Sequence, residues 1–287
     1  MFRFSQSCRV LAIAAARTAK RPIACRQYAS VARPAVKLHN SKFAAFAVSA
    51  VLAGTAYYAW QMNHPVMAEA AAAATAYEGT VEEPHTKLAF PVYLQTGSEW
   101  TRLVGLGVRQ VSFLNLNVYV VGLYMKSQDI GAVRQLKGFE KFNKSEFLAK
   151  EDLALELLKQ PVDVSIRIVP VRSTNTQHLR DGFTRSLLQR MHNQSEDMTE
   201  EQEREIMKAI QEFKSNFPSA KVKKGAEFVF TKNRDGYLEM EFEGKQMGTV
   251  KNTWLAINFF MGYLNPTQPA SEYARQSIAD GFQELFK

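Results

Sequence analysis

Apolar, β-branched and aromatic residues gather in five short runs in the second part of the chain, and each run is dense enough to predict a strand. The runs cover residues 86–96, 107–125, 162–172, 226–231 and 237–243. The second is the longest, and Arg109 is a single permanent charge near its start. Asp235-Gly236, between the last two runs, is typical of a tight hairpin.

Between and after these runs, apolar residues recur with the spacing of a helix. The pattern predicts helices over residues 145–160, 179–194, 199–217, 250–264 and 271–286. The third opens with Thr199 and Gln202, which match a capping box. One face of that helix carries Ile206, Ile210, Phe213 and Phe217. The order of strands, helices, strands and helices predicts an α+β fold with an antiparallel sheet, rather than a doubly wound parallel one.

The N-terminal stretch has a different pattern. Residues 1–28 are rich in Arg, Ala and Ser, contain no acid and interrupt their apolar positions with arginine, which is typical of a mitochondrial presequence. Arg26-Gln27-Tyr28-Ala29-Ser30 resembles the matrix-processing pattern, so we expect the mature chain to begin near Ala29. A basic tail without structure is the alternative.

An apolar segment follows and predicts a transmembrane helix over residues 43–62. Eighteen uncharged residues separate Lys42 from Gln61, close to the roughly 20 that cross the hydrocarbon core. Tyr57, Tyr58 and Trp60 cluster at one end, as in an aromatic belt. An alanine-rich linker over residues 63–84 and a globular domain over residues 85–287 complete the predicted organisation.

The charges beside this segment predict its orientation. Lys37 and Lys42 precede it, whereas the first acidic residues, Glu69 and Glu78, follow it. By the positive-inside rule the N-terminus lies in the matrix. We therefore expect a single-pass protein of the mitochondrial inner membrane whose domain faces the intermembrane space.

The net charge of +8 comes from the N-terminal region alone. Residues 1–68 hold nine basic residues and no acid, so residues 69–287 carry 27 basic against 28 acidic residues. A near-neutral domain does not favour nucleic acid as a partner. Both cysteines, Cys8 and Cys25, also precede the domain, which excludes disulfides, thiolate metal sites and cysteine nucleophiles from it.

Local motifs for catalysis are absent from the sequence. It contains no HExxH, CxxC, GxSxG or glycine-rich phosphate loop. Its five histidines are scattered, and His178 and His192 are fourteen residues apart, which does not match the i, i+4 spacing of a helical metal site. The sequence therefore predicts no metal centre and requires no cofactor, although both histidines are weak candidates to ligate the iron of a haem.

A longer pattern is specific. Residues 88–91 (LAFP) and 105–125 (GLGVRQVSFLNLNVYVVGLYM), with RDGF at 180–183 and ARQSIADGF at 274–282, resemble the chalcone isomerase-fold family. The matching positions in the first part are Gly107, Arg109, Gly122 and Tyr124. With the presequence and anchor, the chain is most similar to the fungal mitochondrial branch, the altered-inheritance-of-mitochondria proteins. The resemblance covers residues 86–287 and implies an open-faced antiparallel sheet with a helical layer that encloses a cleft.

In the plant enzymes of this family, an arginine stabilises anionic charge while side-chain hydroxyls polarise the substrate ketone. Arg109 matches that arginine, but the hydroxyl-bearing strand threonine falls at Tyr119 and the last threonine at Phe259. The family tyrosine falls near His178 and the asparagine near Arg185. Because loss of a single oxyanion donor costs roughly 2.7–4 kcal/mol, the resemblance does not predict a true chalcone isomerase.

Other members of the fold bind fatty acids, with the same arginine meeting the carboxylate. We therefore expect a non-catalytic binder of an apolar, acidic ligand. The candidate ligand-binding residues are Arg109, Tyr119, His178, Arg185, Phe259 and Phe260. Three alternatives remain open: a haem-binding protein with His178 or His192 as ligand, an intramolecular lyase with another substrate, and a membrane-tethered assembly protein without ligand. A purely structural ion pair of Arg109 is also consistent with the sequence.

Overall fold

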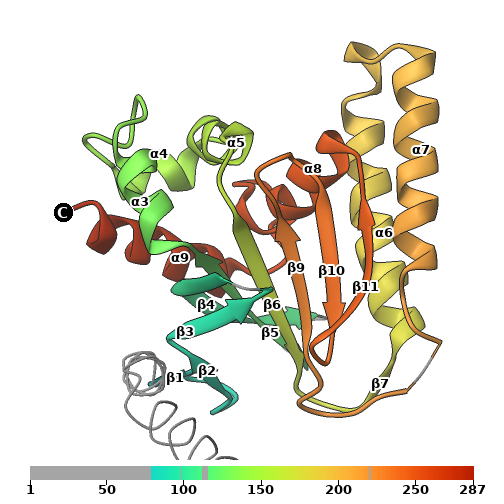
Figure 1. Ribbon diagram of the computed structural model, residues 1–287, viewed down its shortest axis with the longest axis horizontal. Helices are drawn as coiled ribbons and strands as arrows, with labels where there is room; N and C mark the ends of the chain where they lie inside the picture. Colours follow the sequence, from blue (N-terminus) through green and yellow to red (C-terminus); the bar gives the residue numbers. More distant parts are fainter. Residues whose placement is uncertain (1–78, 98, 112–115, 220) are drawn as a thin grey trace, which may run out of the picture. The chain divides into compact units, whose positions relative to one another are not determined.

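The computed structural model describes residues 79–97, 99–111, 116–219 and 221–287 (Figure 1). The predicted presequence (1–28) and transmembrane helix (43–62) lie outside these residues, as does most of the predicted linker. No helix among the described residues is both long and apolar enough to span a bilayer. The first described strand, β1 (Thr80–Glu82), falls within the range 63–84 and pairs with β2 (Ala89–Pro91).

The described residues form one large antiparallel sheet of seven strands in the order β11-β10-β9-β6-β5-β4-β3, as the α+β prediction required. Its strands are β3 (Tyr93–Thr96), β4 (Glu99–Val111), β5 (Leu116–Met125), β6 (Val164–Pro170), β9 (Phe228–Lys232), β10 (Leu238–Phe242) and β11 (Lys245–Val250). A small sheet pairs β7 (Thr174–Asn175) with β8 (Lys221–Val222).

Two strand predictions need correction. The run over residues 107–125 is not one strand but the two arms of a hairpin, because Val111 at the end of β4 pairs with Leu116 at the start of β5. Arg109 therefore lies near the end of a strand instead of at the entrance of one. Strand β11 was not predicted, since its polar and small residues lack a strand pattern. The turn at Asp235-Gly236 is confirmed, and Gly236 has a φ of 79°.

The helices broadly follow the predicted ranges. They are α3 (Ser127–Arg134), α4 (Lys144–Ala149), α5 (Asp152–Lys159), α6 (Thr176–Asn193), α7 (Glu200–Ser215), α8 (Thr253–Leu264) and α9 (Glu272–Leu285), with a 3-10 turn over Ser195–Asp197. The predicted helix over 145–160 divides into α4 and α5 at Lys150, whose backbone is extended. Helix α3 was not predicted. The capping box of Thr199 and Gln202 is confirmed at the start of α7.

Helix α9 packs unusually close to strand β4, and glycines make this approach feasible. A Cβ on Gly107 would lie 2.3 Å from the backbone nitrogen of Ala274, and one on Gly105 would lie 2.5 Å from that of Ile278. On helix α9, Gly281 lies against β4 in the same way, because a Cβ there would lie 1.7 Å from the carbonyl oxygen of Val104. Gly105 and Gly107 are therefore required by the close packing of helix α9 on strand β4.

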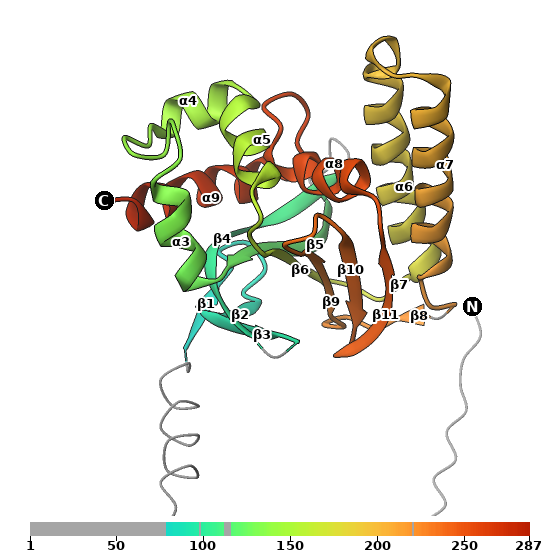
Figure 2. The same cartoon turned by 45° about the horizontal axis from the view of Figure 1, so that its top comes forward.

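The sheet has a helical face and a second, smaller apolar face. Figure 2 shows α8 and α9 above the sheet and the β1–β2 pair below it. On the lower face Phe90 packs directly over Gly122, where a Cβ would meet its ring at 2.9 Å. The guanidinium of Arg167 lies 4.4 Å from the centre of the same ring. Helices α6 and α7 form a pair beside β11, and α6 also contacts α8 (Figure 1).

Candidate functional site

A cleft of about 620 Å³ opens where the end of β4 meets helices α6 and α8. It is lined by Arg109, Glu151, Gly182, Arg185, Ser186, Gln189, Arg190, Asn193, Gln194, Gly262, Asn265, Thr267 and Gln268. Most of these side chains are polar, and three guanidinium groups face one carboxylate. The walls of this cleft are therefore polar and positively charged, whereas the apolar part of the ligand predicted from the sequence requires apolar walls.

Arg109 is half-buried and is held by the neighbouring strand. It lies opposite Tyr119 in the sheet, and its guanidinium carbon is 5.7 Å from the Tyr119 ring centre. The buried hydroxyls of Tyr119 and Tyr263 form a hydrogen bond of 2.9 Å with each other. Tyr119, and to a smaller extent Tyr263, raise the pKa of Arg109 against the opposing effect of burial. The guanidinium thus stays charged at every physiological pH.

No ion pair joins Arg109 to a carboxylate among the described residues. A purely structural ion pair of Arg109 would require such a carboxylate, and this part of the chain does not provide one. Burial raises the pKa of the Tyr263 hydroxyl well above its usual value, so Tyr263 stays neutral. Arg109 is consequently a permanent charge with aromatic neighbours and an open side toward the cleft.

Arg190, also on the cleft wall, is by contrast satisfied internally. Its Nε donates to Oδ1 of Asn258 at 2.8 Å, and its Nη2 lies 3.5 Å from Oε2 of Glu151. Gln194 donates to the same Asn258 oxygen at 3.4 Å and accepts from Nε1 of Trp254 at 2.8 Å. This network ties the end of α6 to α8 and α5, so Arg190 mainly stabilises the wall of the cleft.

Beneath the cleft lies a hollow of only about 20 Å³, and Arg109, Gly182 and Gly262 line both spaces. Its apolar walls include Phe183, Leu187 and Phe259. Pockets that hold small molecules measure roughly 300–1,000 Å³. The apolar interior next to Arg109 is therefore filled by the protein's own side chains.

The structure brings together only some of the residues that the sequence predicted as a site. Arg109 and Arg185 line the cleft, and Phe259 lines the hollow below it. The ring of Tyr119 lies under the guanidinium of Arg109, and Tyr119 lines neither space. Phe260 is fully buried in the core and lines neither space.

The two histidines lie apart from Arg109. His178 and His192 are exposed near opposite ends of α6, and neither lines the cleft. Fourteen residues of helix separate them by about 21 Å. Among the described residues, no cluster of three or more His, Cys, Asp or Glu side chains is arranged to hold a metal ion.

Sequence reasoning missed several residues of this site. Tyr263 follows Phe259 by one helical turn on α8, so the spacing could have placed it beside the predicted residue. The α6 residues recur every three or four positions: Gly182, Arg185, Ser186, Gln189, Arg190 and Asn193. A polar stripe of this kind usually faces solvent, so it did not indicate a cleft.

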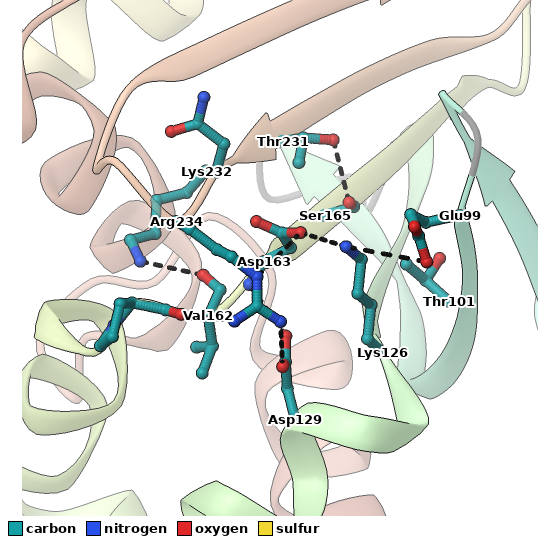
Figure 3. Close-up of polar contacts among 12 residues, drawn as sticks. Glu99, Thr101, Lys126, Asp129, Val162, Asp163, Ser165, Thr231, Lys232 and Arg234 are labelled. Carbon is teal, nitrogen blue, oxygen red and sulfur yellow. Dashed lines mark hydrogen bonds and ion pairs between the residues drawn. The ribbon is translucent and has the colours of Figure 1, made fainter.

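A second polar cluster lies where β5 ends and β6 begins, and Figure 3 shows its contacts. Lys126 contacts Asp163 at 2.5 Å, and Arg234 contacts Asp129 at 2.5 Å. Lys232 is fully buried and donates to the backbone oxygens of Gln160 and Val162 at 2.5 and 3.0 Å. Burial lowers the pKa of Lys232 to about 8, although Asp163 and Asp129 partly oppose this. The two aspartates of this cluster pair with Lys126 and Arg234, and backbone oxygens hold Lys232, so the cluster is a structural feature.

Comparisons with known proteins agree with this architecture. The family model described as chalcone isomerase like matches residues 99–279. The solved structure of an Arabidopsis thaliana fatty-acid binding protein superposes with a TM-score of 0.58 at 22% identity, covering 73% of this chain and 100% of that one. At this identity the likeness establishes the fold alone.

Fungal relatives are closer in sequence. The altered inheritance of mitochondria protein 18 of Debaryomyces hansenii is 29% identical over 201 residues, which cover 63% of this chain and 66% of that protein. An uncharacterized protein of Schizosaccharomyces pombe is 31% identical over 186 residues, covering 61% and 68%. The Kluyveromyces lactis altered inheritance of mitochondria protein 18 is 25% identical, covering 61% and 62%. The match thus spans about two thirds of the length of these relatives.

Proposed function

The chain belongs to the chalcone isomerase-like family, and we propose that it is a non-catalytic mitochondrial binder of an apolar acid whose carboxylate pairs with Arg109. The observation that carries this proposal is a charged, half-buried guanidinium that faces an open cleft and has no carboxylate partner among the described residues. A planar guanidinium matches a carboxylate with two parallel hydrogen bonds. The fatty-acid binding protein of the same fold supports the choice of ligand.

The hydrocarbon chain of such a ligand requires space that the hollow beneath Arg109 does not offer in this state. Gly182 and Gly262 lie where the cleft and the hollow meet, and they leave the entrance between α6 and α8 without large side chains. Phe183, Leu187 and Phe259 would have to rotate as the chain enters. Binding is therefore accompanied by repacking between these two helices.

The residues around Arg109 do not favour ring closure. Phe259 has no hydroxyl, and the hydroxyls of Tyr119 and Tyr263 bond to each other in the buried layer behind the guanidinium. A ketone beside Arg109 would therefore lack a threonine hydroxyl at position 259, and neither tyrosine hydroxyl lines the cleft to take its place as a donor. Since one such donor contributes roughly 2.7–4 kcal/mol to catalysis, we propose a binding protein rather than an intramolecular lyase.

Calorimetric titration of the purified full chain with decanoate tests the binding function. Wild type should bind, and Arg109→Gln should bind at least tenfold more weakly, because hydrogen bonds to charged groups contribute about 1.5–3 kcal/mol. Arg180→Gln is the matched control, since Arg180 is on α6, pairs with Asp181 and does not line the cleft. Equal affinity of wild type and Arg109→Gln would refute the assignment.

The same preparation separates the alternatives. A Soret band in the purified protein that is lost in His178→Ala or His192→Ala would favour haem binding. Turnover of a chalcone by the wild type would favour the lyase. Absence of any bound molecule in native mass spectrometry, together with no response to decanoate, would leave the tethered assembly protein.

For the location, we propose a cleaved presequence over residues 1–28 and a single inner-membrane span over residues 43–62, with the domain in the intermembrane space. The relatives named as mitochondrial proteins support the organelle. Protease treatment of intact mitochondria and of mitoplasts tests the orientation: the domain should be digested only after the outer membrane is opened. Release of the full chain by alkaline carbonate would contradict the anchor.

A further inference from the structure

The cleft contains a second guanidinium without an acidic partner. Arg185 is exposed on α6 and lines the same cleft as Arg109. The guanidinium of Arg185 makes no hydrogen bond or ion pair within the described part of the chain. Arg185 follows Gly182, which touches both the cleft and the hollow below Arg109, by one helical turn. Both guanidinium groups therefore line the same cleft without an acidic partner among the described residues.

The charge in the cleft is not balanced by its own residues. Glu151 is the single carboxylate among the lining residues, and it already lies 3.5 Å from Arg190. The remaining polar side chains are neutral: Ser186, Gln189, Asn193, Gln194, Asn265, Thr267 and Gln268. Two uncompensated positive charges thus face the cleft from Arg109 and Arg185.

A single fatty-acid carboxylate neutralises only one of these charges. The cleft is also large and polar, which suits a broad head group better than a narrow one. We infer that the ligand carries two negative charges in its head group, one held by Arg109 and the other by Arg185. The shared chemistry is a dianionic head, such as a geminal dicarboxylate or a phosphate monoester, on an apolar chain. This inference rests on the proposed binding function and specifies its ligand class.

A matched pair of probes tests the inference. Decanoate and octylmalonate carry the same octyl chain. Octylmalonate differs only by a second carboxylate on the α-carbon. Above neutral pH octylmalonate is a dianion. In titrations of the full chain we expect octylmalonate to bind at least tenfold more tightly than decanoate, since the second carboxylate gains a charge-assisted contact. Comparing octylmalonate with octyl phosphate shows whether the cleft prefers a geminal dicarboxylate or a phosphate monoester as the dianionic head group.

Variants assign the effect to one residue. Arg185→Gln should abolish the preference for octylmalonate and leave the decanoate affinity within about twofold. Arg109→Gln should weaken both probes. Arg180→Gln removes a positive charge from the same helix outside the cleft, so it controls for long-range attraction. Because Arg185 is exposed, Arg185→Gln should keep its fold, which a circular dichroism spectrum checks.

The outcomes distinguish this inference from the function on which it rests. Equal affinity of wild type for octylmalonate and decanoate, or an equal loss of both in Arg185→Gln, overturns the dianionic ligand and leaves the acid-binding function intact. Failure of all three probes to bind overturns both. A preference that Arg180→Gln removes as well as Arg185→Gln would reduce the effect to general charge and also overturn the role of Arg185.

Discussion

The guanidinium of Arg109 lies over the ring of Tyr119, the residue directly opposite on the neighbouring strand, with 5.7 Å from the guanidinium carbon to the ring centre. The hydroxyl of Tyr119 is in turn 2.9 Å from that of Tyr263 on helix α8. This chain of contacts links the sheet to the helical layer and fixes the direction of the guanidinium. Arg109 is therefore presented to the cleft by the fold itself.

We predict that Tyr119→Phe lowers the free energy of unfolding by about 1–3 kcal/mol, because the buried hydroxyl of Tyr263 loses its partner. Urea denaturation measures the change. The double variant Tyr119→Phe with Tyr263→Phe should be less destabilised than the sum of the two single variants, since neither hydroxyl is then left unpaired. Strict additivity would show that the hydroxyls do not interact.

Gly182 is in the interior of α6, and a Cβ at this position meets no atom within 4 Å. Gly182→Ala should therefore stabilise the protein by about 1 kcal/mol through helix propensity. Gly107→Ala is the opposite case, because its Cβ would lie 2.3 Å from the backbone of Ala274, and it should cost several-fold more than this gain. Thermal unfolding measures both. Destabilisation by Gly182→Ala would contradict the open space beside α6.

The buried Lys232 predicts a dependence of stability on pH. Its pKa is about 8 in the folded protein and 10.5 when unfolded, so the unfolded state binds more protons between these values. The contribution of Lys232 to stability should therefore rise with pH across this window, by an amount on the order of 3 kcal/mol. Below pH 8 the full penalty of the buried charge is present.

Lys232→Met removes this titration, so the difference in unfolding free energy between wild type and variant should change across the window in favour of the wild type. Urea denaturation at several pH values measures this difference. Lys245→Met, at an exposed position of β11, serves as the control and should show no such trend. A constant difference for Lys232→Met would mean that the ammonium is not penalised by burial.

Thr199 begins α7 with a reciprocal cap, in which its side chain accepts from the Gln202 backbone and Gln202 accepts from its backbone nitrogen at 2.9 Å. Thr199→Ala should destabilise the protein by about 1 kcal/mol. Thr199→Ser should restore most of the loss, because serine keeps the hydroxyl. Equal stability of wild type and Thr199→Ala, measured by urea denaturation, would show that packing against α6 alone holds the start of α7.

Local patterns in the sequence determined the class of fold. Each of the five predicted strand runs overlaps at least one strand of the structure, and the predicted helical ranges overlap every described α-helix except α3. The capping box placed the start of α7 correctly. The apolar pattern predicts a single strand where the structure has the β4–β5 hairpin, because residues 112–115 between the two arms contain no Gly or Pro to indicate a turn. The side-chain pattern of β11 does not predict a strand, since β11 pairs with β10 at the sheet edge through backbone hydrogen bonds, which any sequence of residues other than proline can form.

The sequence by itself also predicts a permanent charge at Arg109, because this arginine stands in a recognisable run with its glycines. Only the tertiary structure decided what surrounds that charge. The cleft joins residues of β4, α6 and α8, the N-cap residue of α5 and the segment after α8, which are up to about 160 residues apart in the sequence. No local pattern encodes such a meeting. Close packing likewise decided that Phe183, Leu187 and Phe259 fill the interior, since the same apolar residues could have lined a pocket or closed it.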